Sequence, residues 1–342
     1  MKKLLLPLFA CCSLWVQAED APLWLRYPAL SPDGREIAFT YKGDIYTVPA
    51  EGGRAVQLTT NPRHDTRPVW SPDGRYIAFA SDREGSFDVY LMAREGGTPR
   101  RLTTHSGNEY PETFKDNETI LFTASIRPDV KDSQFPSSLF PQIYAVGTKG
   151  GRPVLFSSLA MQELSLSRDG RRLLYQDQKG YEDPWRKHHQ SSITKDIWLC
   201  TLDGERTYQK ITHFAGEDRE PVWSADGRSF YYLSEESGSF NVWKAAADGS
   251  EKRQLTRHTT HHVRSLSVAD DGLLCYTYDG ELYTLREGGK PQKVAVSIVS
   301  DRLERDVVNQ LLRGGATDIA VSPGGKEVAF IVHGDVYVTS ME

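Results

Sequence analysis

The sequence predicts an all-β fold, a propeller of four-stranded antiparallel blades, and three observations support this prediction. Three short motifs recur in one fixed order along the 342 residues. Each complete unit contains four runs of strand composition separated by turn residues, at a spacing of roughly forty residues. Six units follow one another through short loops, whereas a seventh unit is incomplete. We therefore expect six blades and the first, incomplete blade of a second propeller.

The first motif is the turn Ser31-Pro32-Asp33-Gly34. Related segments occur at residues 71–74, 167–170, 224–227 and 322–325, with weaker copies at 115–117 and 270–272. Glycine provides the positive φ that a tight turn requires, and proline presets its own φ for the second position of the turn. We therefore interpret the motif as structural and do not assign catalysis to its aspartates.

The second motif is a polar residue followed by an aliphatic and an aromatic residue. It occurs at residues 44–46, 88–90, 142–144, 196–198, 241–243, 281–283 and 335–337. Its aromatic residues, such as Tyr46, Tyr90, Trp198 and Trp243, fall on the third predicted strand, where we expect them to pack between blades. The third motif, exemplified by Gln57-Leu58-Thr59, closes several units.

Residues 1–18 are typical of an export signal, with Lys2-Lys3, an apolar run and a small-x-small site before Glu19. The alternative is a lipoprotein signal at Cys11. Either signal indicates a periplasmic or otherwise exported protein. No later apolar stretch is long enough to span a membrane. We expect the two remaining cysteines, Cys200 and Cys275, to be separate buried thiols because each lies in an apolar run.

The predicted domains are a signal peptide (residues 1–18), a six-bladed propeller (19–296), a charged connector (297–315) and an incomplete blade (316–342). The sequence also allows a second arrangement. In that arrangement Leu23 to Tyr27 would add the missing strand to the last unit and close a seven-bladed ring.

Two segments resemble tricorn-like serine peptidases. Residues 181–198, which begin Tyr181-Glu182-Asp183-Pro184-Trp185, are similar to an insertion in the fourth blade of that family. Residues 314–338 are similar to the first blade of its second propeller. The resemblance implies a propeller module of a long polypeptide that cuts oligopeptides into short products. It implies no catalytic residue here, because the family's serine, histidine and glutamate lie in a later region.

The sequence offers little evidence for chemistry of its own. The net charge of −5 lacks the basic surplus of a nucleic-acid-binding protein. No nucleophile elbow, zinc-protease motif, phosphate loop or dinucleotide fingerprint occurs. We therefore predict no catalytic residue, no cofactor and no metal site. For His258, His261 and His262, with threonine neighbours, we predict a solvated loop.

Two long adjacent loops, residues 125–141 and 177–194, are the predicted binding surface, since function is usually added to a scaffold through long loops. The candidate binding residues are Tyr181, Trp185, Arg186, Lys187, His188 and His189. We expect a non-catalytic module that guides peptides and contacts other domains or subunits, within a homo-oligomer. The alternative is a self-contained protein-binding propeller resembling TolB. A propeller enzyme of the carbohydrate or lyase type is disfavoured because no acid and base pair stands out.

Overall fold

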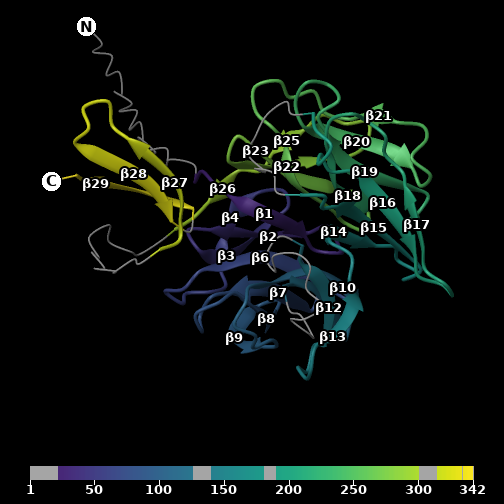
Figure 1. Cartoon of the computed structure of the whole chain (residues 1–342), viewed down its shortest axis with the longest axis horizontal. Helices are drawn as coiled ribbons and strands as arrows, with labels where there is room; N and C mark the ends of the chain where they lie inside the picture. Colours follow the sequence, from purple (N-terminus) through teal and green to yellow (C-terminus); the bar gives the residue numbers. More distant parts are fainter. Residues whose placement is uncertain (1–21, 126–139, 181–189, 300–313, 333, 342) are drawn as a thin grey trace, which may run out of the picture.

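The computed structural model describes residues 22–125, 140–180, 190–299, 314–332 and 334–341. Every regular element in these ranges is a β-strand. Six four-stranded antiparallel sheets, which we number as blades 1 to 6, follow one another in chain order. They are arranged around a common centre (Figure 1). The predicted all-β propeller is confirmed.

Each blade runs from an inner first strand to an outer fourth strand. Blades 1 to 3 consist of β1 (Arg26–Leu30), β2 (Glu36–Tyr41), β3 (Asp44–Pro49) and β5 (Val56–Gln57); β6 (Asp65–Trp70), β7 (Tyr76–Ser81), β8 (Asp88–Ala93) and β9 (Gly96–Arg101); and β10 (Glu109–Asp116), β11 (Thr119–Ala124), β12 (Gln142–Gly147) and β13 (Val154–Ser157). Blades 4 to 6 consist of β14 (Met161–Leu166), β15 (Arg172–Asp177), β16 (Ile197–Thr201) and β17 (Thr207–Lys210); β18 (Asp218–Trp223), β19 (Ser229–Ser234), β20 (Asn241–Ala246) and β21 (Arg253–Gln254); and β22 (Arg264–Val268), β23 (Leu274–Tyr278), β24 (Glu281–Leu285) and β25 (Gln292–Lys293).

The first motif forms the turn between the first two strands of a blade. The Ser31 hydroxyl donates to Asp33 Oδ1 at 2.6 Å, and that oxygen accepts the Arg35 amide at 3.1 Å. Ser31 Oγ also accepts the Glu36 amide, and Gly34 has a φ of 70°. The same serine and aspartate contacts recur in blades 2, 4 and 5. These contacts account for the motif as a structural turn.

In blades 1, 2, 4 and 5 the second and third motifs meet at the start of the third strand. Thr59 Oγ1 accepts the Ile45 amide at 2.9 Å and donates to the Asp44 carboxylate at 3.2 Å. Equivalent threonines accept amides in three other blades, in the pairs Val89–Thr103, Ile197–Thr212 and Val242–Thr256. The threonine therefore fastens the outer end of a blade to its third strand.

Six apolar clusters fill the six junctions between neighbouring blades. Tyr46 of blade 1 lies in one cluster with Cys275 and Leu282 of blade 6. Tyr90 packs with residues of blade 1, Trp198 with blade 3 and Trp243 with blade 4. The predicted packing of these aromatic residues between blades is confirmed, and blade 1 packs directly on blade 6.

A short parallel pairing also joins the two ends of the ring. Strand β26 (Val296–Ser297) pairs with β4 (Gly53–Arg54), which lies in the segment between β3 and β5. The Leu25 amide donates to the Gly280 carbonyl at 3.0 Å. Because β1 is the first strand of blade 1, residues Leu23 to Tyr27 do not complete the last unit, and the seven-bladed alternative is wrong.

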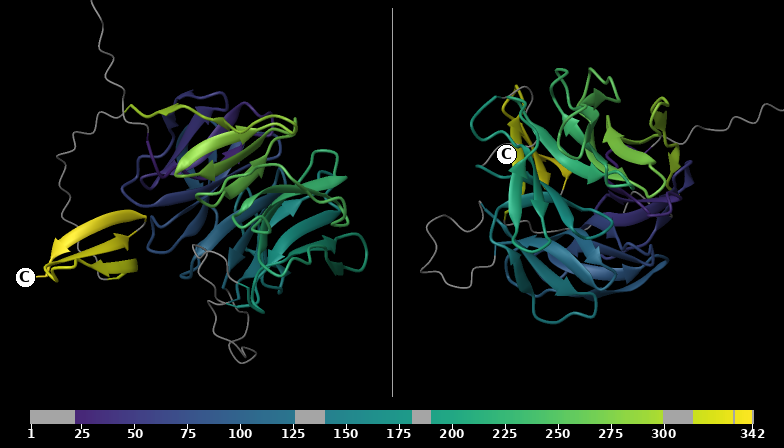
Figure 2. Two further views of the ribbon diagram at one scale, coloured as in Figure 1. Left: turned by 90° about the horizontal axis from the view of Figure 1, so that it is seen from above. Right: turned by 90° about the vertical axis from the view of Figure 1, so that its right-hand side faces the viewer.

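Strands β27 (Ala316–Val321), β28 (Glu327–Val332) and β29 (Asp335–Ser340) form a separate three-stranded sheet. It lies outside the ring in Figure 1 and in the left view of Figure 2. Ile319 is 70% exposed there, whereas Ile37 in β2 is fully buried. The signal peptide and most of the connector lie outside the described residues, so the domain boundaries and the exported location stay predictions.

The described cysteines and histidines give one confirmation and one correction. Cys200 and Cys275 are buried free thiols, as predicted. The solvated loop predicted for the histidine cluster is wrong for two of its members. His262 is 6% exposed and its Nδ1 accepts the Phe240 amide at 2.9 Å, while the His258 ring stacks on Tyr278 at 3.8 Å. Aromatic packing, which the polar neighbours gave no sign of, draws these rings inward.

Candidate channel site

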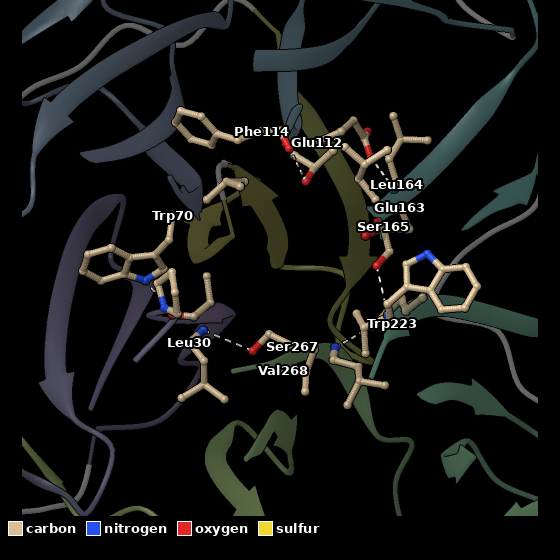
Figure 3. A pocket seen from close by; sticks show the side chains of 18 of the residues that line it. Leu30, Trp70, Glu112, Phe114, Glu163, Leu164, Ser165, Trp223, Ser267 and Val268 are labelled. Carbon is tan, nitrogen blue, oxygen red and sulfur yellow. Dashed lines mark hydrogen bonds between the residues drawn. The ribbon is translucent and has the colours of Figure 1, made fainter. Parts of the chain in front are cut away.

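The inner strands β1, β6, β10, β14, β18 and β22 enclose a cavity of about 640 Å³. Its lining extends along these strands to the turns at one end, where Pro32, Pro72 and Asp270 line it. Figure 3 shows side chains from several blades around this space, with Glu112 and Glu163 close together on one side and Ser267 across from them. Cavities of roughly 300 to 1,000 Å³ are typical of ligand sites.

Two layers of side chains line the cavity at equivalent positions of the inner strands. One layer, which we call the inner ring, comprises Tyr27, Arg67, Glu112, Glu163, Glu220 and Ser265. Two residues further along most of these strands lies a layer of mostly small residues, which we call the collar: Ala29, Val69, Thr113, Ser165, Val222 and Ser267. Residues of both layers line the same cavity.

The inner ring coincides with irregular backbone. Every inner strand has a register shift against its neighbour at this level. Five members have a positive φ of 50° to 57°, namely Tyr27, Arg67, Glu163, Glu220 and Ser265. Such a φ is costly for residues other than glycine and is often found at functional sites. β-Bulges also redirect side chains, which makes this level of the channel the candidate site.

Some channel residues have a structural role because an inner strand is a sheet edge with unpaired amides. Ser165 Oγ accepts the Trp223 amide at 3.0 Å, and Ser267 Oγ accepts the Leu30 amide at 3.3 Å. Glu112 and Glu220 accept the amides of Leu164 and Leu266, at 3.3 and 2.8 Å. These contacts link blade 3 to 4, 4 to 5, 5 to 6 and 6 to 1 around the channel.

Three carboxyl groups of the inner ring influence one another electrostatically. Burial and the Glu163 carboxylate together raise the pKa of Glu112 to about 7, against the opposing effect of Arg67. Burial and Glu163 likewise raise the pKa of Glu220 to about 7, while Arg219 and Arg264 act in the opposite direction. Glu163 therefore acts on both neighbours and concentrates negative charge on one side of the cavity.

Arg67 supplies positive charge at the same level. Its guanidinium lies over the rings of Tyr27 and Tyr110, at 5.2 and 5.0 Å from their centroids. Burial lowers the pKa of Arg67, but Tyr27, Glu163 and Glu112 outweigh it, so the pKa lies above its usual value. The inner ring thus combines a cation, several carboxylates and aromatic faces within one cavity.

An ion pair lies at the mouth of the channel. Arg168 of blade 4 and Asp270 of blade 6 approach to 3.4 Å, with side chains 72% and 51% exposed. The pair connects two blades that are not neighbours, because blade 5 lies between them in the ring order. It therefore extends over part of the opening.

The predicted binding residues lie outside the described residues: Tyr181, Trp185, Arg186, Lys187, His188 and His189.

Sequence reasoning missed the inner ring. A signal was present in the sequence, because Tyr27, Arg67 and Glu220 each directly precede a proline at the same distance before a turn of the first motif. No group of three or more histidine, cysteine, aspartate or glutamate residues suited to a metal ion occurs in the described ranges. No helix within them is long and apolar enough to cross a bilayer.

Comparisons with known proteins agree with this architecture. Tricorn protease homolog 1 of Streptomyces coelicolor is 25% identical over 289 residues, which cover 83% of this chain and 26% of that protein. A tricorn protease homolog of Saccharolobus solfataricus is 23% identical over 291 residues, covering 82% and 25%. The chain thus spans about a quarter of the length of these curated relatives.

Solved structures show the same fold. The crystal structure of the tricorn protease superposes with a TM-score of 0.69 at 21% identity, covering 93% of this chain and 30% of that one. TolB from Acinetobacter baumannii gives 0.51 at 19% identity, covering 81% and 58%. A sequence model described as the tricorn protease N-terminal beta propeller domain matches residues 22–290. The chain therefore belongs to the family of tricorn protease N-terminal β-propeller domains.

Proposed function

We propose that this propeller is a non-catalytic module of a tricorn-like peptidase and that peptides, as substrates or products, pass through its central channel. The observation that carries the proposal is the 640 Å³ cavity, lined by small collar residues and by the charged inner ring. Small residues leave room for side chains of different sizes. The ring offers hydrogen-bonding groups and charges to the polar backbone and ends of a peptide.

The module would also hold an assembly together. The curated relatives that it matches are about four times longer than the matched region, so other domains are expected to contact it. We propose those domains, and further copies of the same polypeptide, as its protein partners. Catalytic residues would come from outside this chain.

Narrowing the channel tests the proposal. In the complete polypeptide that carries this chain, Thr113→Trp places a large side chain in the collar. Thr113→Val is the matched variant that does not narrow the channel, and Thr207→Trp places the same side chain on the exposed outer strand β17. Thermal melting of all three variants establishes that they fold.

We expect Thr113→Trp to slow steady-state hydrolysis of peptides at least fivefold, with both controls near wild type. An unchanged first turnover with slow later turnovers would assign the channel to product release. Slowing of both would assign it to substrate entry. Wild-type rates for a folded Thr113→Trp variant would show that peptides do not pass through this channel.

A further inference from the structure

Arg67 reaches the channel cavity with its hydrogen-bonding groups unused by the protein. No hydrogen bond or ion pair to its guanidinium is found among the residues that the structure describes. The rings of Tyr27 and Tyr110 support it through their faces, which leaves its N–H donors free. A guanidinium presents these donors in a rigid, planar fork that matches a carboxylate. The group is therefore suited to a carboxylate ligand in the cavity.

Glu163 is the complementary feature. Its side chain is exposed to the cavity, and within the described ranges its carboxylate has no hydrogen-bond donor. Glu112 and Glu220 each accept one backbone amide and retain further lone pairs. An ammonium group has three N–H donors, so it can be shared between Glu163 and the carboxylates of the two neighbouring blades. A cation there would also relieve the repulsion that Glu163 exerts on both neighbours.

The two features belong to one site because Arg67 interacts electrostatically with both Glu163 and Glu112. We propose that the inner ring binds short peptides with two free ends, the α-carboxylate on Arg67 and the α-ammonium among Glu112, Glu163 and Glu220. This inference rests on the proposed passage of peptides through the channel. It specifies the class of peptide that the channel binds, namely short peptides with both ends free. The collar above the ring has small side chains, so recognition depends on the peptide ends and little on the peptide's own side chains.

Four forms of one tripeptide test the inference by calorimetry on the full chain. They are trialanine, its N-acetyl form, its C-terminal amide and the doubly blocked form. We expect trialanine to bind, each single block to weaken binding at least tenfold, and the double block to abolish measurable binding. Equal affinity for all four forms, or no binding of trialanine at millimolar concentration, would overturn the inference.

Substitutions assign each end of the peptide to its residue. Arg67→Met should remove the discrimination between trialanine and its amide while keeping the effect of acetylation. Glu163→Gln should do the reverse. Arg75→Met and Glu205→Gln, which lie outside the cavity lining, are the matched controls. If Arg67→Met does not fold, Arg67→Lys keeps the charge, loses the fork and should weaken binding of the two peptides with a free carboxylate, trialanine and its N-acetyl form, but not of the C-terminal amide. Both substitutions having equal effects on all four peptides would contradict the assignment.

Failure of this inference is distinguishable from failure of the proposed function. If the four peptides bind equally but Thr113→Trp slows turnover, passage through the channel stands and recognition of the ends is wrong. If trialanine binds selectively but Thr113→Trp leaves turnover unchanged, the site stands and the passage function is wrong.

Discussion

In two sets of carboxyl groups of this propeller, burial is the main cause of a raised pKa. The two sets have different surroundings. At the junctions between blades, burial raises the pKa of Glu109 and of Asp218 to about 7. These two side chains are almost fully covered by protein, and serine and threonine hydroxyls contact them. In the channel, Glu112 and Glu220 have a pKa of about 7 but line a cavity.

The difference teaches that a raised pKa does not by itself identify a functional site. A junction carboxyl group can change only the stability of the ring, because no ligand can reach it. A channel carboxyl group can change stability and also the affinity for a ligand. Access to the cavity is what separates the two sets, and each prediction below tests one side of this difference.

The largest expected effect belongs to a buried ion pair within blade 2. Arg83 Nη2 lies 2.6 Å from Asp65 Oδ2, and the Asp65 side chain is fully buried. We expect Arg83→Ala to lower the free energy of unfolding by about 3 to 5 kcal/mol, because it leaves a buried carboxylate without its partner. Urea unfolding measures this loss. Arg75→Ala, which removes an ion pair with Asp73 on an exposed turn, is the control and should cause no measurable change.

A smaller and pH-dependent effect is expected at Asp218. Its folded-state pKa of about 7 lies above the ordinary pKa of an aspartate, about 3.9, so the folded chain binds more protons between these two values. Stability should therefore fall as the pH rises through this window. Asp218→Asn removes the charge and should stabilise the protein at pH 8 by on the order of 2 kcal/mol relative to pH 5. The groups around Asp218 are Ser234, Thr212, Asp196 and Glu236.

Unfolding curves of Asp218→Asn and wild type at both pH values test this prediction, with the exposed Glu205→Gln as the control. Asp218→Asn should leave trialanine binding unchanged, because the side chain does not line the cavity. A stability difference that does not depend on pH would contradict the raised pKa of Asp218. A change in peptide affinity would show that Asp218 does not belong with the junction carboxyl groups.

The blades could be predicted from sequence because the interactions that define them are local. Ser71 and Asp73 form a turn within a few residues, and the threonine that closes a blade is a nearby partner of the third strand. Such contacts leave a repeated pattern of residue types. The second motif likewise recurs on the third strand and places Tyr90 between blades.

The inner ring could not be predicted in the same way. Equivalent positions carry different residues, such as Arg67 and Glu163, so they form no motif. Their positive φ is uncommon for residues other than glycine and has no sequence signal here. Sequence reasoning instead favoured the long fourth-blade loop with Arg186 and Lys187, where the described structure tests nothing. A site assembled from one residue per blade becomes visible only when the ring is closed.

The channel carboxyl groups, Glu112 and Glu220, should make the affinity for peptides depend on pH. Trialanine affinity should rise about fivefold from pH 6 to pH 7.5, because Glu112 and Glu220 lose protons while most of the peptide ammonium, whose pKa is about 7.7 to 8.0, keeps its charge. The charged groups that act on these two carboxylates are Glu163, Arg67, Arg219, Arg264 and, on Glu220, Lys195. Glu220→Gln should reduce the rise, and the N-acetyl peptide should show none. Affinity that is flat for wild type would remove these carboxylates from the site.

The smallest expected effect is at the mouth of the channel, where the Arg168–Asp270 pair is exposed. Exposed ion pairs contribute little to stability, so Asp270→Asn should leave the melting temperature within about 1 °C of wild type. Removing the pair should free the Arg168 side chain and open part of the mouth. We expect trialanine to associate about twofold faster in stopped-flow measurements, with the equilibrium affinity changed less because dissociation also accelerates. Arg168→Gln should behave alike, since it breaks the same pair from blade 4. If Asp270→Asn speeds association but Arg168→Gln does not, the charge of Asp270, and not the bridge between two blades, controls entry.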